Sequence, residues 1–129
     1  MLDHIGFPVS DLPRSRAFYT AALTPLGLTL LMEVTSEQTG GHGAHLGFGA
    51  DGKPFFWIGD GKAPQGAAHV AFAASDRAAV DEFHRAALVA GGRDNGAPGI
   101  RPHYHANYYG AFVIDPDGNN IEAVCHRPA

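Results

Sequence analysis

The architecture of this chain follows from two stretches, residues 2–27, LDHIGFPVSDLPRSRAFYTAALTPLG, and residues 67–92, AAHVAFAASDRAAVDEFHRAALVAGG. A shift of 65 residues, which takes position 4 to position 69, superposes them without a gap. The residues that then coincide include His4 and His69, Phe7 and Phe72, Ser10-Asp11 and Ser75-Asp76, Phe18 and Phe83, Ala21-Ala22-Leu23 and Ala86-Ala87-Leu88, and Gly27 and Gly92. So many matches at one shift indicate an internal duplication, and each half should therefore fold as one unit.

Each copy is expected to open with a strand and to continue into a helix. The alternating stretches Leu2–Val9 and Ala68–Ala74 predict the two strands. Serine and aspartate side chains accept hydrogen bonds from the free N–H groups of a first helical turn, so Ser10-Asp11 and Ser75-Asp76 contain the expected caps. The first helix should run to about Leu23 and the second to about Val89.

Three short strands are expected after each helix, which gives a β-α-β-β-β order in both halves. They lie near Leu28–Val34, Ala44–Phe48 and Pro54–Ile58 in the first half, and near Gly92–Asp94, Ala111–Asp115 and Asn120–Cys125 in the second. Glycine-rich segments predict loops at Gly40–Gly43 and Gly96–Asn107 and a linker at Gly59–Gly66. The predicted fold class is α+β, with one domain over residues 1–129, a first unit over 1–60 and a second over 66–127.

Strand alternation places the polar residues of these strands. Successive side chains of a strand point to opposite faces, and Ile5 and Val70 are expected on the faces that pack on the helices. The residues before them, His4 and His69, should therefore point away from the helices. In the last strand Glu122 takes the same open face, and an acidic residue in an apolar strand is costly unless it is paired or binds a cation. The 65-residue shift makes Trp57 the equivalent of Glu122. Three of the four equivalent positions, His4, His69 and Glu122, therefore carry metal-ligand chemistry.

The composition excludes several classes of protein. The chain has 9 basic and 13 acidic residues and a net charge of −4, which argues against a nucleic-acid surface. It has one cysteine, Cys125, so no intrachain disulfide can form. The first residues lack a signal-peptide pattern, and no stretch approaches the roughly 20 apolar residues that span a bilayer. We expect a cytoplasmic protein without a membrane partner.

The sequence resembles the vicinal oxygen chelate superfamily, which contains glyoxalase I, extradiol dioxygenases, fosfomycin-resistance proteins and bleomycin-resistance proteins. The resemblance rests on Leu2–Ile5, Ser15–Tyr19, His69–Phe72 and Phe112–Glu122, and it covers nearly the whole chain. It implies curled mixed sheets around a metal-holding cup and a homodimer, sometimes with units exchanged between chains. It also implies that His4, His69 and Glu122 are the metal ligands. Glyoxalase I has a fourth ligand where this chain has Trp57, whose indole cannot bind a metal.

The expected function is that of a divalent-metal-dependent enzyme acting on a small oxygen-bearing molecule. Imidazole and carboxylate ligands suit Zn, Fe, Mn, Ni or Co, and three ligands leave positions open for dioxygenase-, lyase- or transferase-type chemistry. The resemblance also implies that Glu122 can shuttle a proton. The other candidate acids, bases or orienting groups are His103, His105, Tyr108 and Tyr109, and the candidate substrate-pocket residues are Phe55, Trp57 and Arg101.

Two other interpretations stay open at this point. One is a binding module of the bleomycin-resistance type, which sequesters a small molecule without chemistry and typically lacks the metal triad. The other is a dimeric scaffold with a dead site, in which the loop histidines and tyrosines serve as anchors or dimer contacts. Phe55 and Trp57 could also be ordinary core residues.

Overall fold

The computed structural model describes residues 2–61, 66 and 68–129, and part of the expected linker Gly59–Gly66 lies outside them. The elements follow the predicted order in both halves. They are β1 (Ile5–Val9), α1 (Leu12–Leu23), the 3-10 turn η1 (Thr24–Leu26), β2 (Thr29–Val34), β3 (His45–Ala50), β4 (Lys53–Asp60), β5 (His69–Ala73), α2 (Arg77–Val89), β6 (Arg93–Ile100), β7 (Tyr109–Ile114) and β8 (Asn120–Cys125). None of the helices in the described part of the chain is long and apolar enough to cross a membrane.

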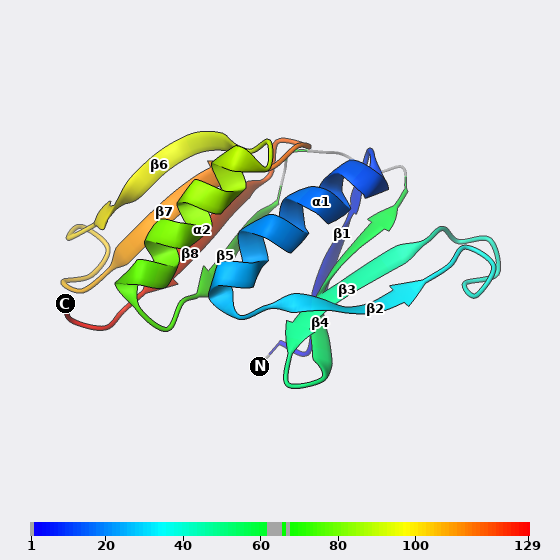
Figure 1. Cartoon of the computed structure of the whole chain (residues 1–129), viewed down its shortest axis with the longest axis horizontal. Coiled ribbons are helices and arrows are strands. Elements are labelled where there is room, and N and C mark those ends of the chain that lie inside the picture. Colours follow the sequence, from blue (N-terminus) through cyan, green and yellow to red (C-terminus); the bar gives the residue numbers. More distant parts are fainter. Residues whose placement is uncertain (1, 62–65, 67) are drawn as a thin grey trace.

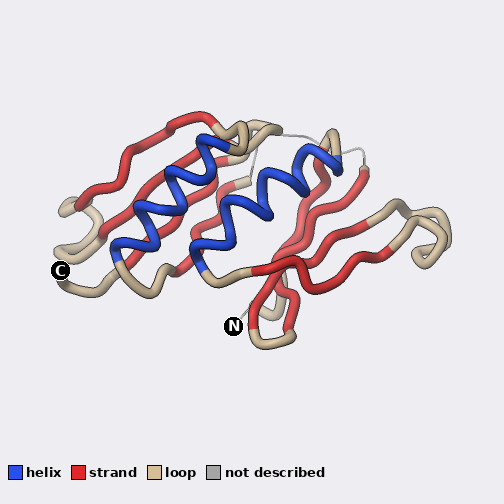
Figure 2. The backbone as a smooth tube through the Cα atoms, in the orientation of Figure 1, coloured by secondary structure: helices blue, strands red, loops and turns tan. Residues whose placement is uncertain are grey.

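The strands form two four-stranded mixed sheets of equivalent topology, which confirms the predicted fold class. One sheet has the order β1-β4-β3-β2 and the other β5-β8-β7-β6, with one parallel pair in each, β1 with β4 and β5 with β8. The sheets are curled but do not close. Helices α1 and α2 pack against each other and lie on the same side of the sheets (Figures 1 and 2), so the opposite face of each sheet is left uncovered by helices.

Both helices begin where the sequence predicts, and aspartate provides each cap. The Asp11 side chain accepts from the Arg14 N–H at 3.0 Å, and the Asp76 side chain accepts from the Ala79 N–H at 2.8 Å. Pro13 lies in the first turn of α1, where a missing N–H costs no hydrogen bond.

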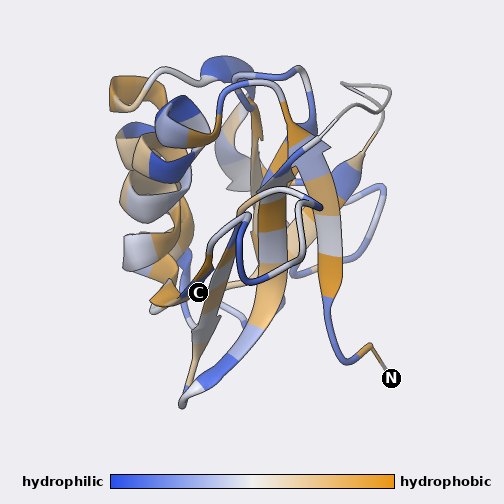
Figure 3. Cartoon of the chain, turned by 90° about the vertical axis from the view of Figure 1, so that its right-hand side faces the viewer, coloured by the Kyte–Doolittle hydropathy of each residue, from blue (hydrophilic) through white to orange (hydrophobic). Residues whose placement is uncertain are grey.

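One hydrophobic core serves both units. Phe56 of β4 makes edge-on contacts with Tyr19 of α1 at 5.0 Å and with Phe72 of β5 at 5.2 Å between ring centroids. Hydrophobic and hydrophilic residues alternate along the strands (Figure 3). In β8 this alternation buries Ile121, Ala123 and Cys125 in the core, as predicted, and leaves Glu122 on the other face.

A buried carboxylate ties the two units together. The hydroxyl of Tyr19, in α1, donates to the side chain of Asp115 at 2.5 Å, and both residues are buried. Asp115 begins the tight turn Asp115–Gly118 between β7 and β8, and its carboxylate also accepts from Asn119 and from the Asp117 N–H. Gly118 takes φ of 92° in this turn, which glycine adopts without strain.

Several local predictions differ from the structure. The first strand begins at Ile5 rather than Leu2, and Gly59 and Asp60, expected in the linker, end β4. The segment Gly96–Ile100, expected to be loop, belongs to β6, an edge strand with two register shifts. Its glycines and Pro98 conceal it in the sequence, and an edge strand tolerates proline because one side of it makes no ladder bonds. Ile5, expected to pack on the helix, is 37% exposed, because it lies on the edge strand β1 while α1 packs against β4 and β2.

Candidate functional site

The 65-residue equivalence holds across both sheets, so each unit has a matching row of side chains on its helix-free face. In the first sheet Trp57 of β4 pairs with Gly6 of β1 and Gly47 of β3. In the second sheet Glu122 of β8 pairs with the residues that the shift predicts, Ala71 of β5 and Phe112 of β7. The two units therefore present an indole and a carboxylate at the same structural position.

Glu122 is the chemical centre of the second unit. It is only 2% exposed, and it lines a cavity of about 500 Å³ together with His69 and Tyr108. Its Oε1 lies 3.3 Å from His69 Nε2, and its Oε2 accepts a hydrogen bond from the Tyr108 hydroxyl. Burial raises the pKa of Tyr108 above its ordinary value, and the hydrogen bond to Glu122 raises it further, so the phenol stays a donor. Gly110 permits this contact, because a Cβ there would lie 3.0 Å from the Tyr108 ring.

The arrangement of His69 and Glu122 suits a cation. The Nδ1 of His69 lies 2.9 Å from the carbonyl oxygen of Asn120, which can only accept, so this ring nitrogen carries the proton. In the neutral imidazole the lone pair of Nε2 then faces the Glu122 oxygen, and two acceptors oppose each other across 3.3 Å. This contact is favourable when a proton, carried by either group, or a metal ion lies between the two atoms. The donor atoms present therefore fit one side of a metal centre.

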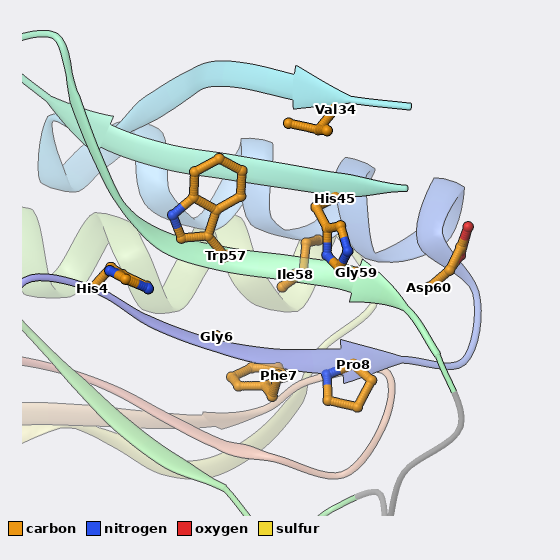
Figure 4. Close-up of a pocket in the computed structure, with 10 residues that line it drawn as sticks. All are labelled: His4, Gly6, Phe7, Pro8, Val34, His45, Trp57, Ile58, Gly59 and Asp60. Carbon is orange, nitrogen blue, oxygen red and sulfur yellow. The ribbon is translucent and has the colours of Figure 1, made fainter. Parts of the chain in front are cut away.

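His4 is the equivalent of His69 in the first unit, but it precedes β1 and its ring has a different partner. Its Nδ1 lies 2.7 Å from a carboxylate oxygen of Asp3, so that nitrogen donates, and Nε2 has no hydrogen-bond partner among the residues that the structure describes. Hydrogen bonds from His4 and from Lys53 hold the pKa of Asp3 below its ordinary value, which keeps it ionised as an acceptor. His4 lines a different cavity, of about 510 Å³, together with Trp57 (Figure 4).

The three predicted ligands therefore do not line one cavity within one chain. His69 and Glu122 share the cavity of the second unit, and His4 lies in that of the first. Among residues 2–61, 66 and 68–129 there is no group of three or more histidine, cysteine, aspartate or glutamate side chains able to hold a metal ion.

The other predicted site residues fall into two groups. His103 and Tyr108 line the cavity of Glu122, and Trp57 lines that of His4. The remaining predicted residues line neither cavity. Tyr109 donates to Asp81 of α2 at 2.5 Å on the helix side, and Phe55 packs against the core. His105 is exposed near His126, and Arg101 donates to the Ala97 carbonyl at 2.7 Å and lies over the Phe112 ring.

Two contributors to the site were missed in the sequence analysis. Asp3, which orients His4, is adjacent to it in the chain, and its carboxylate could have been considered as a partner. Tyr104, which lines the cavity of Glu122 and packs edge-on against Tyr108 at 5.1 Å, stands in the same loop as the predicted residues.

Known proteins with the same architecture are numerous. The family model of the Glyoxalase/Bleomycin resistance protein/Dioxygenase superfamily matches residues 1–123. Among solved structures, a glyoxalase/bleomycin resistance protein from Albidiferax ferrireducens is 28% identical, with a TM-score of 0.80, and the match covers 95% of this chain and 96% of that one. No protein of curated function gives a significant sequence match.

Two further structures have named activities. A glyoxalase I mutant from Zea mays is 25% identical, with a TM-score of 0.70, over 95% of this chain but only 46% of the maize protein. A mutant of the fosfomycin resistance protein FosX from Listeria monocytogenes, solved with Mn(II), is 19% identical and has a TM-score of 0.67. The match covers 96% of this chain and 88% of that one, and at this identity it is evidence for the fold alone. The duplicated units, the curled sheets and the family match over residues 1–123 agree, and the chain belongs to the Glyoxalase/Bleomycin resistance protein/Dioxygenase superfamily.

Proposed function

We propose that this protein is a divalent-metal-dependent enzyme that acts on a small oxygen-bearing molecule. The observation that carries the proposal is the pair formed by His69 Nε2 and the buried Glu122 Oε1, two atoms 3.3 Å apart whose lone pairs could bind the same metal ion. Because His4 lines a separate cavity, the third ligand would come from a second copy of the chain. A homodimer in which each centre combines His4 of one protomer with His69 and Glu122 of its partner would then hold two metal ions.

The side chains around Glu122 have distinct roles in this proposal. The Tyr108 hydroxyl holds Oε2, so it orients the carboxylate and leaves Oε1 for the ion. A bound divalent ion would supply Lewis-acid chemistry, polarising a substrate carbonyl or lowering the pKa of water. Glu122 can take a proton from the substrate and return it, and His103, at the cavity, is a second group for proton transfer. Arg101 does not line the cavity but lies over the ring of Phe112, which does, so its charge would attract an anionic substrate group toward the cavity.

Metal content tests the proposal directly. We expect about one divalent ion per chain in the wild type by elemental analysis, and little in His4→Ala, His69→Ala or Glu122→Ala. The control is His84→Ala, because His84 lies on α2 and contacts Asp94 rather than the site. A wild type that takes up no divalent ion after dialysis against Zn, Mn, Fe, Ni or Co would contradict the proposal and favour a binding module of the bleomycin-resistance type.

A mixing experiment tests whether two protomers share each centre. His4→Ala and Glu122→Ala are unfolded together and refolded as a mixture. If each centre is shared, every mixed dimer contains one centre with all three ligands, and metal binding and turnover return in part. If each centre lies within one chain, no dimer has an intact centre and nothing returns.

A further inference from the structure

The cavity of the first unit has an aromatic wall that a metal site does not require. Its Trp57 occupies the position that the second unit gives to Glu122. Where Glu122 has Phe112 beside it, Trp57 has Gly47, and this exchange leaves room for the indole over β3. A Cβ at Gly47 would lie only 2.8 Å from Cη2 and 2.9 Å from Cζ2 of Trp57. The benzene end of the indole therefore rests directly on the Gly47 backbone.

A second glycine lies on the other side of Trp57. A Cβ at Gly6 would lie 3.1 Å from the Trp57 Cβ, so Trp57 has a glycine as its pairing partner on both neighbouring strands. Figure 4 shows the indole spread over β3 and β4, between His4 and His45, with its face toward the cavity. A core tryptophan would be covered on this face, whereas Trp57 is only half-buried and the cavity in front of it measures about 510 Å³.

The rest of this cavity has apolar and polar parts. Its apolar lining comes from Phe7, Pro8 and Val34, and its polar lining from His4, His45 and Asp60. Aromatic rings prefer offset-stacked or edge-on contacts with other rings, and an indole offers the largest such surface. The volume lies within the range that holds a small organic ligand.

We propose that Trp57 is an aromatic platform and that the substrate is a small molecule with a planar ring, which stacks on the indole. The proposal rests on the proposed function only in naming this ligand the substrate, because the platform itself needs no metal. Trp57 is then a specificity-determining residue, and the oxygen atoms of the substrate would point toward His4.

Fluorescence reports on the platform directly, because Trp57 is the single tryptophan of the chain and can be excited selectively over the tyrosines. Two matched pairs of probes are titrated into the metal-free protein, benzoate against cyclohexanecarboxylate and phenol against cyclohexanol. Each pair shares its charge and approximate size and differs in the planar ring. We expect the planar member to change the Trp57 emission and to bind about tenfold more tightly than the saturated one.

Variants separate stacking from general packing, with binding measured by calorimetry. Trp57→Phe keeps a ring and should stay within about threefold of the wild type, while Trp57→Ala should lose about tenfold for the planar probes only. Gly47→Ala displaces the indole and should weaken the same probes. Circular dichroism melts identify any variant that fails to fold. Comparing Trp57→Phe with Trp57→Ala tests the effect of a ring at the same position of the fold.

The results distinguish this proposal from the preceding one. Equal binding of planar and saturated probes, unchanged binding by Trp57→Ala, or no binding of either planar probe would overturn the platform and leave metal uptake untouched. Conversely, a wild type without metal that still prefers planar probes through Trp57 would retain the platform and contradict the metal-dependent enzyme. Metal content should be the same in Trp57→Ala as in the wild type, because indole is no metal ligand.

Discussion

Replacing Tyr19 by phenylalanine tests whether the buried hydrogen bond between the units stabilises the fold. The substitution removes the hydroxyl that donates to Asp115 at 2.5 Å and leaves the ring in its contacts with Phe18 and Phe56. Asp115 is 3% exposed, so water does not readily replace the lost donor. Burial raises the pKa of Tyr19 far above its ordinary value, and the negative charge of Asp115 raises it further. The hydroxyl is therefore a donor throughout the working range of pH.

The size of the effect follows from what Asp115 retains. Its carboxylate keeps the Asn119 N–H and side-chain amide and the Asp117 N–H, so it does not become an unpaired buried charge. The cost is therefore that of one hydrogen bond to a charged group, about 2 kcal/mol, rather than the larger penalty of an orphaned ion. For a chain of this length that corresponds to a fall of roughly 8 °C in Tm.

Urea denaturation of the wild type and Tyr19→Phe measures the free energy of unfolding. Tyr109→Phe is the matched control, because it removes a hydroxyl–carboxylate bond of the same 2.5 Å length to Asp81, a residue that is exposed to solvent. The control should lose less than about 0.5 kcal/mol. If Tyr19→Phe costs no more than the control, the bond between α1 and the β7–β8 turn does not stabilise the fold, and the reasoning fails.

Two further substitutions test other parts of the structure. Gly92→Ala should lower the free energy of unfolding, measured with urea, by about 2 kcal/mol or more, because the added Cβ would lie 2.5 Å from Val113 and 2.7 Å from Phe18 in the core. Gly99→Ala is the control and should cost far less, because the nearest atom to its added Cβ belongs to the flexible end of Arg101. Equal costs would contradict the packing argument. His84→Ala should raise the pKa of Asp94, because the hydrogen bond from His84 is the largest cause that holds this pKa below its ordinary value of 3.8. The stability that the lowered pKa provides is present above pH 3.8 and is lost as the pH falls through the folded-state pKa. An unchanged NMR titration of Asp94 would show that the contact is not made in solution.

Much of the architecture could be predicted from the duplication. The shift of 65 residues, found in the helices and first strands, also relates the paired rows Gly6–Trp57–Gly47 and Ala71–Glu122–Phe112. The capping aspartates and the helix ends were predicted because these signals are local. The extent of β6 was not, because a strand rich in glycine and proline owes its conformation to its partner β7 and not to its own residues.

The candidate site was predicted less completely. Tyr108 and Tyr109 had equal standing in the sequence, but one contacts Glu122 and the other contacts Asp81 on the helix side. Adjacent residues at the start of a strand point to opposite faces, and the register of that strand decides which faces the cavity. Sequence spacing also could not show that His4 lies in a separate cavity from His69, because that depends on how the two sheets are set side by side.

The sequence by itself determined the two units, their element order, the faces of their strands and the three residues with metal-ligand chemistry, because alternation and duplication are properties of the chain. The tertiary structure decided which of these residues meet. It brought His69, Glu122 and Tyr108 together, assigned His4 and Trp57 to another cavity, and placed the indole over Gly47. Distances across strands and between sheets depend on packing between residues far apart in the chain, which no local pattern encodes.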